Sequence, residues 1–156
     1  PLAHETDGTL IIEGEPYPVT GTSWFDHQWG ELGNVISVGW DWFAIQLDDD
    51  REMMLFTIHQ KGEPLLLGGS WIMPNGETIE ISPDNFEVTP LSKWDSPHTG
   101  KSYPIGWEIL VDDVKLILSP VMEDQEVVSS YKVYWEGACE VSGDATGRAY
   151  VELTGY

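Results

Sequence analysis

Short runs of β-branched and aromatic residues, each bounded by glycine, asparagine, aspartate or proline, recur along the whole sequence. Such runs are typical of β-strands, and no long segment carries the three-to-four-residue spacing of an amphipathic helix. We therefore predict an all-β chain. The predicted strands cover residues 9–13, 17–22, 35–48, 52–60, 65–73, 78–81, 85–91, 105–111, 114–119, 131–141 and 148–154.

The residues between these runs predict short antiparallel connections. Asn75-Gly76 is the strongest hairpin signal, and the pairs at 49–50 and 112–113 and the segment 143–147 are also suited to tight turns. Strands joined in this way form a meander. Residues 92–103 interrupt the pattern, so we predict a loop there, across the surface or over the mouth of a barrel.

The segment 37–47 is apolar at both strand parities. One parity carries Trp40 and Trp42, and the other carries Phe43 and Ile45. Both faces of this strand should therefore be at least partly buried, as in a barrel wall that packs outward and encloses a lumen. A sheet this large tends to close, because closure removes exposed edges. We predict an antiparallel β-barrel of about eight to ten strands.

The charge balance limits the possible partners. Seven Lys and Arg against 27 Asp and Glu give a formal charge of −20, which leaves little positive charge for phosphate groups. We expect neither nucleic acid nor an anionic membrane surface as a partner. The 156 residues have the length of one domain, residues 1–156, and 41% hydrophobic residues suffice for one core.

Targeting signals are absent from the sequence as given. No run approaches the roughly 18 consecutive apolar residues of a spanning helix, and no positively charged start followed by an apolar core marks a signal peptide. We expect a soluble chain with no integral membrane segment. The single cysteine, Cys139, excludes an internal disulfide and is expected to be a small buried hydrophobe. The compartment stays open, and a secreted or periplasmic location is compatible with these features.

The segment Asp26-His27-Gln28-Trp29 is the densest cluster of polar and aromatic residues. In a strand, His27 and Trp29 share one face. Burial would disfavour the charged imidazole of His27 and a carboxylate such as Asp41 or Glu136 would favour it, a balance suited to proton transfer. The alternative is that His27 only forms a hydrogen bond across the sheet.

The segment Trp40-Asp41-Trp42 places a carboxyl between two indoles. Desolvation there would raise the pKa of Asp41 and keep it protonated as a proton donor. Alternatively, Asp41 accepts hydrogen bonds and stays ionised. The eight tryptophans could line a cavity for a flat or elongated apolar ligand, although aromatic residues also dominate the cores of β-barrels.

Sequence support for metals and cofactors is lacking. The four histidines have no metal-ligand spacing, and no phosphate loop, dinucleotide fingerprint or Gly-Xaa-Ser-Xaa-Gly motif occurs. We therefore expect no metal site, and hydrolase, kinase and nicotinamide-dependent functions lack their usual sequence support.

Four segments form a distinctive set. They are residues 19–30, which include Asp26-His27-Gln28-Trp29-Gly30; Gly39-Trp40-Asp41-Trp42-Phe43; Ser96-Pro97-His98-Thr99-Gly100 with Tyr103-Pro104; and Tyr134-Trp135-Glu136-Gly137-Ala138 with residues 150–156. In this order, over nearly the whole chain, they resemble the AttH-like and carotenoid hydratase (hydroxyneurosporene synthase) family.

The resemblance implies a lipocalin-like β-barrel with a hydrophobic cavity. Proteins of the family usually hold two such domains, and this chain resembles the C-terminal one. Relatives protonate an alkene to hydrate carotenoids, or fold a linear polyene for Diels–Alder cyclisation, without a cofactor. By motif, the resemblance places proton transfer at His27 and Asp41, and the walls of the substrate site at Trp29, Trp40, Trp42 and Tyr134.

The leading functional hypothesis is therefore a cofactor-independent lyase or cyclase that acts on hydrophobic isoprenoid or polyketide polyenes. The alternative is a binding module for an apolar ligand, in which the same tryptophans bind and the acids are structural, or one domain of a longer protein. The expected partner is a small hydrophobic molecule. Either a second copy in a homodimer or an N-terminal domain could supply a missing wall of the pocket.

Overall fold

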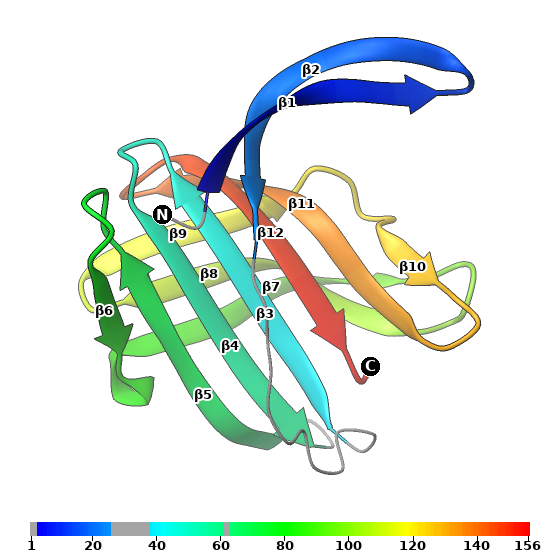
Figure 1. The fold of residues 1–156 in the computed structure, drawn as a ribbon. Coiled ribbons are helices and arrows are strands. Elements are labelled where there is room, and N and C mark those ends of the chain that lie inside the picture. Colours follow the sequence, from blue (N-terminus) through cyan, green and yellow to red (C-terminus); the bar gives the residue numbers. More distant parts are fainter. Residues whose placement is uncertain (1–2, 26–37, 61–62) are drawn as a thin grey trace.

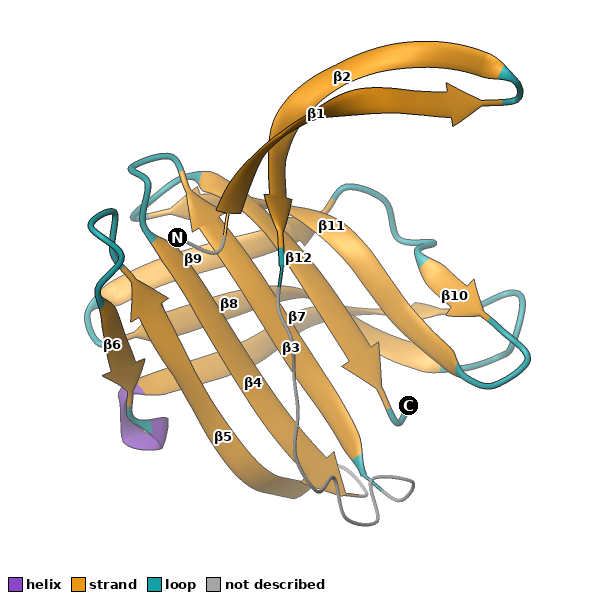
Figure 2. Cartoon of the chain, in the orientation of Figure 1, coloured by secondary structure: helices purple, strands orange, loops and turns teal. Residues whose placement is uncertain are grey.

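The computed structural model describes residues 3–25, 38–60 and 63–156, and strands dominate this part of the chain (Figure 2). The strands are β1 (Ala3–Ile12), β2 (Glu15–Trp24), β3 (Gly39–Leu47), β4 (Glu52–Gln60), β5 (Glu63–Ile72), β6 (Thr78–Ile81), β7 (Phe86–Asp95), β8 (Ser102–Val111), β9 (Val114–Pro120), β10 (Glu126–Val128), β11 (Val133–Gly143) and β12 (Gly147–Thr154). A short 3₁₀ turn, η2 (Pro83–Asn85), joins β6 to β7.

Ten strands form one curled antiparallel sheet in the order β6-β5-β4-β3-β12-β11-β9-β8-β7, with β10 paired to β11. The front strands β5, β4, β3 and β12 face β7, β8 and β9 behind them (Figure 1). Most strands pair with a neighbour along the chain, and two pairings skip intervening strands: β9 with β11, and β3 with the last strand, β12. The prediction of an antiparallel, lipocalin-like β-barrel is confirmed, in the form of a half-barrel. Among the described residues no ladder joins β6 to β7, so the barrel has an open seam there.

Local turn chemistry explains several connections. Gly76 has a φ of +83° and donates a backbone hydrogen bond to Met73, which closes the β5–β6 turn at the predicted Asn75-Gly76 pair. Asp50 and Asp112 also have positive φ, which aspartate tolerates better than most residues. The predicted turns at these positions are confirmed.

The predicted loop over residues 92–103 is wrong for half of its length. β7 runs on to Asp95 and β8 begins at Ser102, so only residues 96–101 form a turn. The reason is a cross-strand pair: Trp94 lies opposite Tyr103, and their rings stack with centroids 6.2 Å apart. Pro97 and Gly100 mark the turn itself and do not end the sheet.

The interior of the barrel is filled by one parity of each strand. On β3, Phe43 and Ile45 are at most 1% exposed. The ring of Trp107 meets Phe43 edge to face at 5.5 Å and Trp135 at 6.0 Å, the geometry that aromatic quadrupoles favour. Cys139 is buried among them, as expected, and burial raises the pKa of its thiol to about 12.

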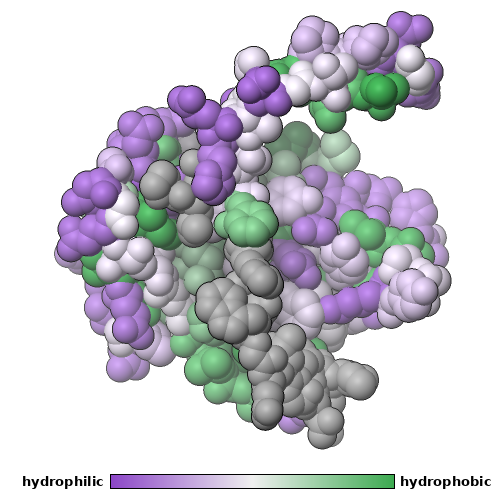
Figure 3. All heavy atoms as spheres, in the orientation of Figure 1, coloured by the Kyte–Doolittle hydropathy of each residue, from purple (hydrophilic) through white to green (hydrophobic). Residues whose placement is uncertain are grey.

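The first two predicted strands lie outside the barrel. β1 and β2 form a separate hairpin that projects from the sheet as a curved arm (Figure 1). Apolar side chains stand out along this arm against the hydrophilic surface (Figure 3), and Ile11 is 73% exposed. At its base, Trp24 packs on Trp42 of β3. No helix in the described residues is long and apolar enough to cross a membrane.

Candidate functional site

Asp41 is the inward-facing residue nearest the start of β3, on the same face as Phe43. Two side chains from distant parts of the chain meet its carboxyl. The hydroxyl of Tyr156 donates a hydrogen bond to Asp41 Oδ1 at 2.8 Å, and His59 Nε2 lies 3.5 Å from the same oxygen. The rings of His59 and Tyr156 are also in contact, with centroids 5.3 Å apart. We call Asp41, His59 and Tyr156 the Asp–His–Tyr cluster.

Two glycines make room for this cluster. A Cβ on Gly39 would lie 2.3 Å from His59 Cε1 and 2.4 Å from the carbonyl oxygen of Thr154, so only glycine leaves space for the imidazole. Gly155 has a φ of +90°, in the left-handed region that favours glycine. The turn that follows β12 at this glycine brings Tyr156 to the cluster.

Burial is the main electrostatic influence on Asp41. It raises the pKa of the Asp41 carboxyl above its ordinary value, against the lowering effects of the hydrogen bond from Tyr156 and the charge of His59. Burial and the neighbouring Asp41 charge also raise the pKa of Tyr156. The Tyr156 hydroxyl therefore stays protonated and acts as a hydrogen-bond donor to Asp41. A carboxyl with a raised pKa holds a proton closer to neutral pH, as a general acid requires.

His59 brings an unused polar atom to the site. Its side chain is 9% exposed, and Nε2 makes no hydrogen bond within the described residues. The 3.5 Å separation from Asp41 is longer than an ordinary N–H···O bond. Because buried polar atoms are rarely left unsatisfied, an atom of this kind is a candidate contact for a substrate or a water molecule.

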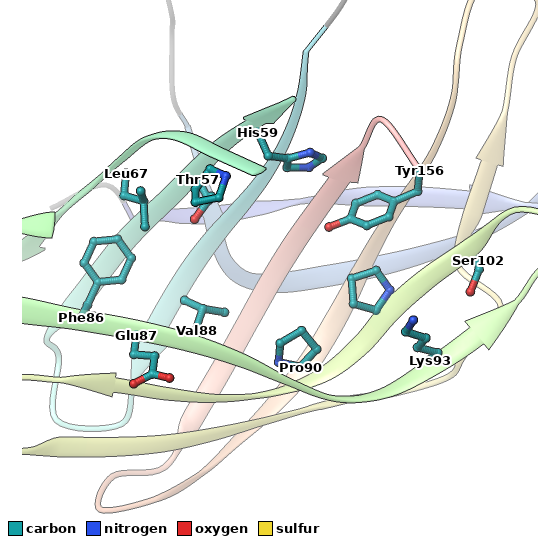
Figure 4. A pocket seen from close by; sticks show the side chains of 12 residues that line it. Thr57, His59, Leu67, Phe86, Glu87, Val88, Pro90, Lys93, Ser102 and Tyr156 are labelled. Carbon is teal, nitrogen blue, oxygen red and sulfur yellow. The ribbon is translucent and has the colours of Figure 1, made fainter. Parts of the chain in front are cut away.

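A cleft of about 560 Å³ lies beside the Asp–His–Tyr cluster, at the seam between β4–β5 and β7–β8. His59 and Tyr156 line one side, and apolar side chains of β7, including Phe86 and Val88, line the other (Figure 4). This volume falls within the usual range of small-molecule sites. Asp41 itself does not line the cleft, but both of its partners do.

A set of hydrogen bonds to Glu126 fixes the position of Tyr103, which packs against Tyr156. The ring of Tyr103 lies 5.8 Å from that of Tyr156, and its hydroxyl donates to Glu126 Oε1 at 2.9 Å. Ser96 and Thr99 donate to the same carboxylate, each at 2.6 Å. Burial alone would raise the pKa of Glu126, but these hydroxyl hydrogen bonds lower it overall. The ionised carboxylate thereby ties β10 to the turn that follows β7.

Of the two predicted catalytic residues, Asp41 is in the described part of the chain and His27 is not. Asp41 belongs to the Asp–His–Tyr cluster. His27, and Trp29 of the predicted binding residues, lie outside the described residues. The histidine found beside Asp41 is His59, which sequence reasoning noted only as one of four scattered histidines.

The three other predicted binding residues lie on the far side of the sheet from Asp41. Trp40 and Trp42 point to the outer face of β3, because side chains alternate along a strand. The indole of Trp40 donates to Glu152 at 3.2 Å. Tyr134 alternates with the buried Trp135 on β11 and shares this outer face. The structure therefore does not bring these three residues together with the Asp–His–Tyr cluster, and their role in binding stays a prediction.

Tyr156 and His59 are the site residues that sequence reasoning missed. The available signals were the glycines: Gly39 two residues before Asp41, and Gly155 directly before Tyr156. Within the described residues, no group of three or more His, Cys, Asp or Glu side chains is arranged to hold a metal ion.

Comparison with known proteins gives a consistent assignment. The model of the family described as AttH-like matches residues 3–156. The crystal structure of a protein assigned as AttH from Nitrosomonas europaea is 34% identical, with a TM-score of 0.89 over 97% of this chain and 50% of that chain. The crystal structure of kievitone hydratase from Nectria haematococca is 22% identical, with a TM-score of 0.79 over 95% of this chain and 49% of that chain.

The two solved structures differ in what they show about this chain. At 22% identity, the likeness to kievitone hydratase shows the fold alone. The chain spans about half the length of both solved structures. No functionally curated protein matches it.

Proposed function

This chain belongs to the AttH-like family, and from that premise we propose that it is a cofactor-independent hydro-lyase that hydrates an alkene of a hydrophobic isoprenoid or polyketide polyene. The observation that carries the proposal is the Asp–His–Tyr cluster beside an apolar cleft. Kievitone hydratase, which shares the fold, is by its name a hydratase. The arrangement of acid and cleft fits the same class of reaction.

The proposed reaction needs only water as a co-reactant. The proton held by the Asp41–His59 pair adds to one alkene carbon, and the electron pair of the π bond forms the new C–H bond. Water attacks the cationic carbon, and the proton that water releases returns to the pair. Each cycle thus consumes one alkene and one water and regenerates the acid.

The cluster assigns a separate task to each residue. The carboxyl of Asp41 holds the proton, because burial raises its pKa. His59 lines the cleft, and its Nε2 has no hydrogen-bond partner among the described residues. Tyr156 holds the carboxyl in one orientation through its hydrogen bond. The apolar side chains that line the cleft would contact the hydrocarbon part of the substrate.

The test is turnover of a panel of acyclic polyenes in ¹⁸O-labelled water, with the labelled alcohol detected by mass spectrometry. We expect Asp41→Asn to lower turnover by about 100-fold or more, the usual effect of losing a general acid, and to leave ligand affinity unchanged. Asp124→Asn is the matched control, because this carboxylate is about half exposed and pairs with His98 away from the cleft. It should retain full activity.

The pH profile provides a second readout. Turnover should be high where Asp41 is protonated and should fall as the pH rises through the pKa of Asp41. Because the hydrogen bond from Tyr156 lowers that pKa, Tyr156→Phe should move the fall in turnover to higher pH. Turnover by Asp41→Asn at the wild-type rate would contradict acid catalysis and favour cyclisation by the shape of the cleft. Binding without turnover in the wild type would favour a binding module.

A further inference from the structure

Lys93 differs from the other described lysines in having no partner. Lys101 donates to the carbonyl oxygen of Tyr156, Lys115 pairs with Glu108 at 2.6 Å, and the ammonium of Lys132 lies 3.5 Å from the ring centroid of Trp40. Lys93 makes no hydrogen bond or ion pair with any residue that the structure describes. The chain has 27 acidic residues, yet none of those that the structure describes forms an ion pair with Lys93.

The position of Lys93 indicates that its charge is available to a ligand in the cleft. Lys93 lines the same cleft as His59 and Tyr156 and supplies its only cation among the described residues. Ser102, on the neighbouring strand β8, lines the same end of the cleft (Figure 4). The side chains of Lys93 and Ser102 thus place an ammonium group and a hydroxyl group at one end of an otherwise largely apolar cleft.

The opposite end of the cleft has the opposite character. Phe86 and Leu67 supply apolar walls there, and Glu87 carries a negative charge at the same end of β7, on the opposite side of the strand from Phe86 (Figure 4). Glu87 and Lys93 lie six residues apart on β7, a distance of about 20 Å at the rise of an extended strand. An elongated anion in the cleft would therefore be oriented, with its charged end at Lys93 and away from Glu87.

We propose that the substrate of this site is amphipathic: an elongated apolar polyene with a carboxylate at one end, which binds to Lys93 and Ser102. This inference rests on the proposed function, because it concerns the same cleft, and it narrows the substrate class from pure hydrocarbons to polyene acids. The lysine supplies a charge-assisted hydrogen bond, and the serine supplies a second donor.

The test compares two forms of one fluorescent polyene, parinaric acid and its methyl ester, titrated into the full chain. The acid should bind about fivefold more tightly than the ester, the effect of one partly exposed ion pair, and added NaCl should reduce this preference. Lys93→Gln should abolish the preference and leave the affinity for the ester unchanged. Lys115→Gln is the matched control and should keep the preference, because Lys115 pairs with Glu108 and does not line the cleft.

The outcomes separate this inference from the proposed function. Equal binding of acid and ester by the wild type, or an unchanged preference in Lys93→Gln, would overturn the carboxylate subsite and leave the cleft as an apolar site. Failure of both probes to bind would overturn it as well. Alkene hydration is judged separately, by ¹⁸O incorporation in Asp41→Asn against the wild type.

Discussion

Gly39 shows how a missing side chain builds a site. It lies two residues before Asp41 and directly opposite His59 in the β3–β4 ladder. The imidazole of His59 occupies the space in which any other residue at position 39 would place its Cβ. The carboxyl–imidazole pair therefore depends on a residue that contributes no functional group.

Replacement of this glycine should be costly. We expect Gly39→Ala to lower the free energy of unfolding by about 1–3 kcal/mol, the usual cost of overpacking, because the new methyl group would clash with His59 and with the backbone oxygen of Thr154. Urea denaturation would measure the change. Gly8→Ala is the control, because a Cβ on Gly8 meets no atom within 4 Å. A similar loss in both variants would contradict a specific clash.

The β1–β2 arm is the element that packs least against the rest of the chain. Its two strands pair with each other from Ala3 opposite Trp24 to Ile12 opposite Glu15, and no other strand that the structure describes extends the ribbon. A two-stranded hairpin is marginal in water unless another surface packs on it. Near its base, Trp24 contacts Trp42, whereas Leu10 and Ile11 are more than half exposed.

Hydrogen exchange should show this difference between elements. We expect backbone amides near the tip of the arm to exchange much faster than those of β3 and β12, which are paired on both sides in the barrel. Mass spectrometry of peptides after deuteration would measure the rates. Equal protection of the arm and the barrel would mean that a partner covers the arm. If that protection increased with protein concentration, the partner would be a second copy of the chain, as in the predicted homodimer.

For the whole molecule, the dominant property is charge. A net charge of −20 on a barrel of 156 residues creates self-repulsion that opposes the compact state. Few described cations offset it, and three of the carboxylate ion pairs are at least partly exposed. Exposed pairs of this kind contribute little stability each.

Salt should therefore stabilise the folded chain. We expect Tm to rise by several degrees between low salt and about 0.5 M NaCl, because screening weakens the repulsion more than it weakens the few ion pairs. Differential scanning calorimetry would measure the rise. A series with KCl at equal ionic strength should coincide with the NaCl series, and a Tm that falls with added salt would contradict the repulsion argument.

Sequence patterns alone are enough to predict the class of the fold. Strand alternation, the Asn75-Gly76 hairpin and the order of the strands can be read from neighbouring residues, because steric preference and turn chemistry act over a few positions. The same local reasoning singled out Asp41 between Trp40 and Trp42. It failed at residues 92–103, where the pairing of Trp94 with Tyr103 outweighs the local signals of proline and glycine.

The surroundings of Asp41, in contrast, could not be predicted from neighbouring residues. Its hydrogen-bond donor, Tyr156, is 115 positions away in sequence, and His59 reaches it from the next strand. The structure also shows that Asp41 points into the barrel while Trp40 and Trp42 point to its outer face, and that the seam of the barrel opens beside β7, where Lys93 lies. These features depend on which distant strands pair and on how the sheet curls. Such pairing is a cooperative result of packing the whole core, and no short segment encodes it.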